Sequence, residues 1–140
     1  MNTVSLSLLI VAMFALSACV DRTTADQKLV KACQAAILAF SDEGDTDERT
    51  NAETIRDHAK LGKGYREVTM DLTITDGFHG RDESHSCIFQ EEFSFGNMAH
   101  RASIYQLNFG GRIIGQKDYE IQGSLQDMQK LTAAVERVLR

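Results

Sequence analysis

The sequence contains none of the short motifs by which common catalytic sites are recognised. Its 140 residues include no nucleophile elbow, no HExxH metal motif and no dinucleotide fingerprint. The glycines at 62 and 64 and at 110 and 111 lack the further glycines and the following Ser or Thr of a phosphate loop. The sequence therefore predicts no cofactor and no bound metal, and it gives no direct evidence of an enzyme.

Basic residues are in the minority, with 15 Lys and Arg against 20 Asp and Glu, for a net charge of −5. Nucleic acids and anionic membrane surfaces both demand a basic face, so neither is expected as a partner of the folded domain. An acidic balance suits a basic protein partner, although many soluble proteins are this acidic for solubility alone. No internal repeat or low-complexity tract divides the chain.

Lys and Arg are absent before Arg22, and the chain opens instead with an apolar run over residues 4–14. The run is too short for a membrane span, which needs about 20 apolar residues. It has the length of a signal-peptide apolar region leading to a small-residue cleavage site. The sequence Leu16-Ser17-Ala18-Cys19 that follows resembles the lipobox of bacterial lipoproteins.

The resemblance implies that residues 1–18 are a signal peptide and that Cys19 is lipidated. Residues 19–24 would then be a tether, and residues 25–140 a single periplasmic domain held to the membrane by two or three acyl chains. Val20 follows the cysteine, where an aspartate would imply retention in the inner membrane. The expected location is therefore the bacterial outer membrane, facing the periplasm. The alternative is an uncleaved N-terminal helix.

Cysteine is scarce, and its odd count of three would leave one thiol over. If the lipobox uses Cys19, then Cys33 and Cys87 remain as one pair in an oxidising compartment. Cys33 lies on the apolar stripe of an expected helix, and Cys87 lies on the inward face of an expected strand. A helix packed on that sheet would direct both side chains into one layer, so we predict a Cys33–Cys87 disulfide.

Apolar spacing predicts three helices. The first covers residues 25–40, is capped by Thr24 with Gln27, and has a stripe that includes Leu29, Cys33 and Ile37. An acidic loop over residues 41–51 follows, whose spacing does not fit a calcium loop. A short helix is predicted over residues 52–61. The last helix follows Ser124, with Asp127 completing its capping box.

Between the helices, alternating residues predict strands at 65–75, 84–95 and 102–109, with a short fourth strand at 112–115 or 118–122. The fold class is therefore α+β, with an N-terminal helix, an antiparallel meander of three or four strands and a C-terminal helix, the helices lying on one sheet face. Glu91 is the exception on an otherwise apolar strand face. The aromatic residues are assigned to the core: Phe89, Phe93, Phe95, Tyr105 and Phe109.

His79, Asp82 and His85 form the best candidate metal site, because zinc can use two histidines and a carboxylate. The spacing matches no known ligand pattern, and polar residues are common in such a turn. His85 beside Cys87 resembles a thiol with its base, but a disulfide next to an ordinary histidine is the simpler interpretation.

Three functions follow as hypotheses. The first is a lipid-anchored binding or accessory protein of the envelope that acts through contacts with another envelope protein. The second is an acidic inhibitor or chaperone of a basic envelope protein, motivated by the acidic residues between Asp42 and Glu48. The third is a metal-dependent enzyme using His79, Asp82 and His85. The oligomeric state is not predicted.

Overall fold

The computed structural model describes residues 20–41, 47–76, 79–97 and 99–140. Helix α2 (Arg22–Phe40) comes first and helix α3 (Leu125–Leu139) comes last. Between them, six strands form one antiparallel sheet whose spatial order is the chain order. The strands are β1 (Asp47–Asp57), β2 (Tyr65–Asp76), β3 (His79–Ser94), β4 (Ala99–Phe109), β5 (Arg112–Lys117) and β6 (Glu120–Gln122).

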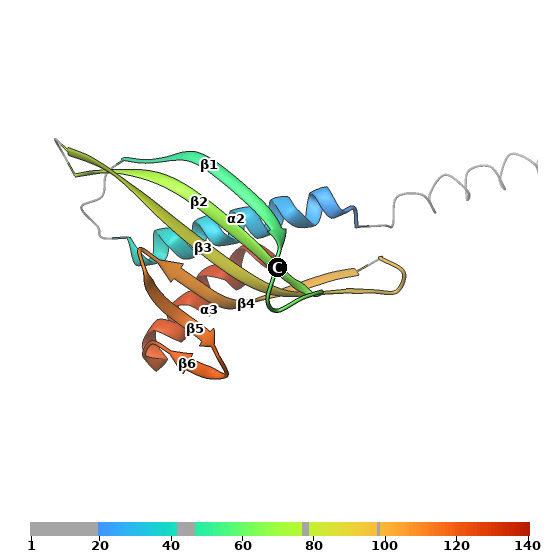
Figure 1. Cartoon of the computed structure of the whole chain (residues 1–140). Coiled ribbons are helices and arrows are strands. Elements are labelled where there is room, and N and C mark those ends of the chain that lie inside the picture. The colour runs from blue at the N-terminus through green and yellow to red at the C-terminus, as the bar shows by residue number, and fades with distance from the viewer. Residues whose placement is uncertain (1–19, 42–46, 77–78, 98) are drawn as a thin grey trace, which may run out of the picture.

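Both helices contact the sheet and each other, so they cover one of its faces (Figure 1). The predicted α+β class, the antiparallel meander and the two terminal helices are confirmed. The core lies between the helices and the inward residues of β2, β3, β4 and β5, which include Val68, Phe89, Leu107 and Ile114. Neither described helix is both long enough and apolar enough to cross a membrane.

Helix α2 has the predicted apolar stripe, with Leu29, Cys33 and Ile37 fully buried. Its predicted start is wrong by one turn. Asp21 is the N-cap, and its carboxylate accepts a hydrogen bond of 2.8 Å from the backbone N–H of Thr23. Helix α3 begins as predicted, with Ser124 and Asp127 closing a reciprocal capping box.

The predicted count of three or four strands is too low, mainly because residues 52–61 do not form a helix. Residues 47–57 are strand β1, which pairs with β2 along its length. The register shifts between Thr50 and Ala52, and such a bulge breaks the alternation by which a strand is recognised in sequence. Pairing with an otherwise open edge of β2 outweighs the local helical preference. The predicted acidic loop is strand from Asp47 onward, and residues 42–46 lie outside the described residues.

The turn after β2 is also shorter than predicted, because β3 begins at His79 rather than at residue 84. In addition, β5 and β6 both form, where the sequence predicted one short strand. A second register shift, between Ile88 and Phe89, leaves Tyr105 of β4 without a direct partner on β3. Ile104 consequently packs against the core, whereas Tyr105 contacts Tyr65 edge-on at a ring distance of 5.1 Å. The prediction that Tyr105 belongs to the main core is therefore wrong.

Candidate functional site

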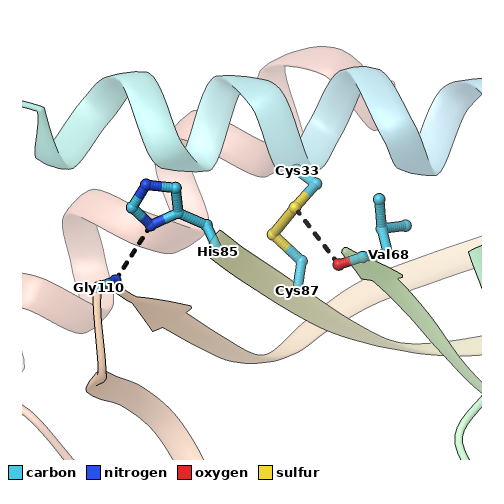
Figure 2. Close-up of a disulfide and its surroundings, with 5 residues drawn as sticks. All are labelled: Cys33, Val68, His85, Cys87 and Gly110. Atoms are coloured by element: carbon cyan, nitrogen blue, oxygen red, sulfur yellow. Dashed lines mark hydrogen bonds between the residues drawn. A yellow bond between two sulfur atoms is a disulfide. The ribbon is translucent and has the colours of Figure 1, made fainter. Parts of the chain in front are cut away.

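The predicted disulfide between Cys33 and Cys87 is present, and it joins α2 to β3 inside the core (Figure 2). The two Cα atoms are 5.6 Å apart, and neither residue is exposed to solvent. The Cys33 sulfur lies 4.0 Å from the Val68 carbonyl oxygen, a van der Waals contact because a half-cystine carries no proton. These cysteines are structural in this oxidised state, and neither is a thiol nucleophile.

His85 lies on the same inward face as Cys87 and is fully buried. Its ring stacks on Phe109 at 4.7 Å, and Nδ1 accepts a hydrogen bond of 3.0 Å from the backbone N–H of Gly110 (Figure 2). That bond assigns Nδ1 as the unprotonated nitrogen. Nε2 is 3.5 Å from a carboxylate oxygen of Glu83. The histidine thus connects β3 to the β4–β5 turn.

The three residues of the candidate zinc site all lie on β3 but do not converge. Side chains alternate along a strand, so Asp82 is on the sheet face opposite His85. Asp82 instead accepts a hydrogen bond of 2.7 Å from Thr73 of β2. Among the described residues, no group of three or more potential ligands gathers in a metal-binding arrangement.

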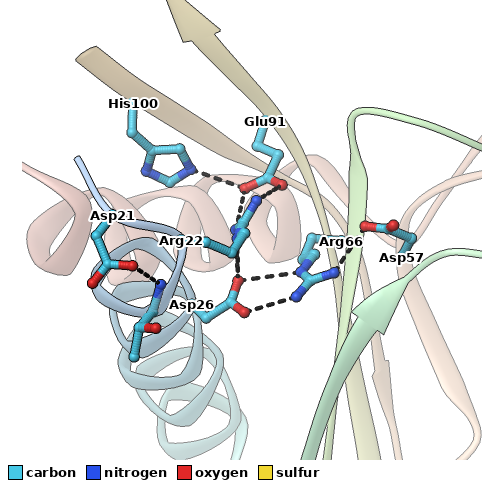
Figure 3. A network of polar contacts seen from close by, with 8 residues as sticks. Asp21, Arg22, Asp26, Asp57, Arg66, Glu91 and His100 are labelled. Carbon is cyan, nitrogen blue, oxygen red and sulfur yellow. Dashed lines mark hydrogen bonds and ion pairs between the residues drawn. The ribbon is translucent and has the colours of Figure 1, made fainter. Parts of the chain in front are cut away.

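A network of charged side chains closes the helix–sheet interface where α2 begins (Figure 3). Glu91 accepts hydrogen bonds of 2.6 and 2.9 Å from the two terminal nitrogens of Arg22, and its carboxylate also lies 2.9 Å from Nε2 of His100. Asp26 joins Arg22 to Arg66, with ion pairs of 2.6 and 2.7 Å. The Glu91 side chain is only 6% exposed. The inward glutamate that looked exceptional in the sequence is thus fully paired.

Burial alone would raise the pKa of Glu91, but hydrogen bonds from Arg22 and His100 and the charge of Arg22 outweigh it. The pKa of Glu91 is therefore lowered from 4.5. Asp26 follows the same pattern: burial opposes ionisation, and hydrogen bonds and charge from Arg66 and Arg22 lower its pKa from 3.8. Both carboxylates are more acidic in the folded state than in the unfolded chain. The stability they contribute is present above their unfolded pKa values and is lost as the pH falls through the lowered ones.

We expect Glu91→Gln to lower the free energy of unfolding at neutral pH by about 2 kcal/mol, because the Arg22 guanidinium then loses one of its two charged partners and keeps only Asp26. Glu136→Gln is the control, since its partner Arg140 is exposed and such pairs are worth about 0–1 kcal/mol. Urea unfolding from neutral pH down to pH 3 measures both. The wild type should lose stability below the ordinary carboxylate range, and Glu91→Gln should lose less. Parallel pH profiles would show that Glu91 does not stabilise the fold.

At the edge of the sheet formed by β6, three large apolar side chains are exposed to solvent. Tyr119 is 96% exposed, Ile121 is 72% exposed and Leu125 is 77% exposed. They belong to three consecutive pieces of chain: the β5–β6 turn, strand β6 and the first turn of α3. Strand β6 also ends the sheet, so one side of its backbone has no neighbouring strand among the described residues. We call these three residues the β6 surface.

The β5–β6 turn holds its tyrosine in an unfavourable backbone conformation. Asp118 and Tyr119 have φ values of 50° and 69°, a pair of positive angles normally found in turns with Asn and Gly. A bulky residue there costs about 1–3 kcal/mol. The fold thus retains at this turn an aromatic residue that is both strained and 96% exposed.

A shallow hollow of about 600 Å³ lies between α2, β4 and α3, lined by Lys28, His100, Arg101, Glu136 and Arg140 among others. Its charges are of both signs, and Arg140 is already paired with Glu136 at 2.9 Å. The hollow therefore indicates no particular class of ligand.

Sequence reasoning missed the β6 surface, because Tyr119 and Ile121 lie in the alternative fourth strand at 118–122 and Leu125 lies at the start of the predicted last helix. The signal available in the sequence was the pair Asp118-Tyr119, which lies at the turn between two short strands. Cys19, the predicted lipidation site, lies outside the described residues, as do Asp42, Glu43 and Asp45 of the acidic stretch. The sequence matches no protein-family model, no curated protein and no solved structure.

Proposed function

We propose that this chain is a lipid-anchored protein of the bacterial envelope that works by binding another envelope protein. The lipobox supports the anchor. The buried Cys33–Cys87 disulfide is compatible with an oxidising compartment such as the periplasm. The observation that carries the binding role is the β6 surface, with its strained and exposed Tyr119.

Tyrosine suits this role for a physical reason. It presents a large rigid area with one polar tip, loses little conformational freedom on binding, and is enriched among residues that dominate interface energy. Ile121 and Leu125 add exposed apolar area within the next six residues of the chain. The partner expected here is therefore a protein with a complementary apolar site. Within the described residues, no equally distinct arrangement supports the acidic-inhibitor or metal-enzyme hypotheses.

Tyr119→Gly is expected to separate binding from folding. Glycine adopts a positive φ without strain. The free energy of unfolding of the variant should therefore equal that of the wild type or exceed it by up to about 1 kcal/mol. The complex with the partner should weaken at least tenfold, because removing an aromatic anchor costs about 2 kcal/mol or more. Urea unfolding measures the first effect, and the amount of partner that co-purifies with the variant and with the wild type measures the second.

The partner itself is found with a photo-reactive amino acid placed at Tyr119 in intact envelopes. The same amino acid at Lys63, an exposed residue before β2, is the control. A discrete product from position 119, absent at position 63 and lost in Ile121→Ser, is the expected result. Equal labelling from both positions, or a product unaffected by Ile121→Ser, would refute the β6 surface as the binding site. A product that disappears at raised salt would instead favour a basic partner.

A further inference from the structure

The β3–β4 hairpin tip lies directly beside the point where the chain enters the domain. The backbone N–H of Val20 donates a hydrogen bond of 2.7 Å to the carbonyl oxygen of Asn97 in this tip. Cys19 is the residue directly before Val20 in the chain. Acyl chains on Cys19 would therefore be attached one residue before the contact between Val20 and the hairpin, whose tip lies near the start of α2 (Figure 1).

The same tip carries the second strongly exposed aromatic residue of the described chain. Phe95 is 79% exposed and has a φ of 54°, and the two residues after it also have positive φ values. The prediction that Phe95 belongs to the core is wrong, because β3 ends at Ser94 and Phe95 begins the turn to β4. Along the inward face, Glu91 and Phe93 are covered by Arg22 of the helix, whereas Phe95 lies beyond it.

The charge pattern around the tip suits contact with a lipid surface. Residues 93–99 carry no charged side chain, although the chain as a whole is acidic. An anionic surface would repel most of the domain but not this segment. Phenylalanine is among the side chains that membrane-surface segments bury at the boundary between headgroups and acyl chains. One phenylalanine binds a bilayer weakly by itself, but an anchor beside it makes insertion an intramolecular event.

We propose that the β3–β4 hairpin tip is a second membrane contact, with Phe95 inserted into the bilayer interface beside the lipid on Cys19. This inference rests on the lipid anchor of the proposed function. The contact orients the domain as well as tethering it. In Figure 1, β6 lies well away from the start of α2 and from this tip. The β6 surface is thereby held away from the membrane and available to a protein partner.

The chain contains no tryptophan, so a single introduced one reports its own surroundings. The full-length lipidated protein is reconstituted in vesicles of phosphatidylethanolamine and phosphatidylglycerol, with and without brominated acyl chains. Phe95→Trp should show a blue-shifted emission in vesicles and lose most of its intensity with brominated lipid. Tyr119→Trp is the matched control, since it also places an exposed aromatic in a positive-φ turn. The tryptophan emission of this control should keep the long wavelength of an exposed indole in vesicles, and brominated lipid should not quench it.

Flotation with the vesicles and labelling by a fatty-acid probe, lost in Cys19→Ala, establish the anchor in the same samples. If the protein floats and takes up label but Phe95→Trp is quenched no more than Tyr119→Trp, the tip does not contact the membrane and only this inference fails. If the wild type neither floats nor takes up label, the anchor of the proposed function fails and this inference fails with it. Urea unfolding confirms that both variants are folded.

Discussion

Removing the Cys33–Cys87 disulfide is expected to lower the free energy of unfolding by about 4 kcal/mol. The bond spans 54 residues of sequence, and closing a loop of that size removes about this much conformational entropy from the unfolded chain. Most domains are stable by only about 5–15 kcal/mol, so the loss is a large share of the total. Reduction should lower the melting temperature markedly.

The alanine variants test the pairing directly. Cys33→Ala and Cys87→Ala should be destabilising to a similar degree, and the double variant should cost little more than either, because each single change already breaks the cross-link. Urea unfolding with and without reductant measures the effect, and reductant should not further destabilise the single variants. Thiol titration of the unfolded, unreduced protein provides the control. Detection of two free thiols from Cys33 and Cys87 would rule out the disulfide.

Gly115→Ala is expected to be about as damaging, at about 4 kcal/mol. Gly115 has a φ of 116°, and a Cβ there would overlap the carbonyl oxygen of Tyr105 and lie 2.9 Å from the Cα of Gln106. These are backbone atoms of the paired strand β4, so they cannot rotate away. Tyr105 is the extra residue at the register shift of β4, and the absence of a side chain at Gly115 leaves room for its carbonyl.

Gly111→Ala is the matched control for this variant. Gly111 also has a positive φ, at 89°, but a Cβ there would have no neighbour within 4 Å. Its substitution should cost only the backbone strain, about 1 kcal/mol. Urea unfolding compares the two under identical conditions. If both glycines tolerate alanine equally, the close approach of β4 and β5 at Gly115 is not a constraint on the fold.

The regular periodicities of this sequence predicted the elements whose burial is continuous. The stripe of α2 and the alternation of β2 each repeat over enough residues to identify an element, and the capping box marks the start of α3. The disulfide followed from the stripe of α2, which carries Cys33, and from the inward face of β3, which carries Cys87, once Cys19 was assigned to the lipobox. Strand β1 could not be found in this way, since its bulge disrupts the alternation and its stability comes from pairing with β2.

The exposed aromatic residues and the buried charged network were harder to predict from the sequence. Whether a side chain is exposed or paired depends on how separate elements are placed relative to one another. Phe95 continues the sequence alternation of Cys87, Phe89 and Phe93, but β3 ends at Ser94 and Phe95 has a positive φ in the following turn, where its side chain is exposed. Glu91 belongs to that series too, and its partners Arg22 and His100 come from two other elements. Pairing across such distances leaves no local pattern in the chain.

The sequence by itself determined the α+β class, the inward faces of α2, β2 and β3, and the pairing of its two inward cysteines, because hydrophobic burial imposes a period that local residues display. Only the tertiary structure decided the six-strand count, the paired state of Glu91 and the exposure of Phe95 and Tyr119. Each of these depends on strand pairing or on the reach of a helix over a sheet. Those are relations between segments distant in sequence, and their free energy is gained only when the segments meet.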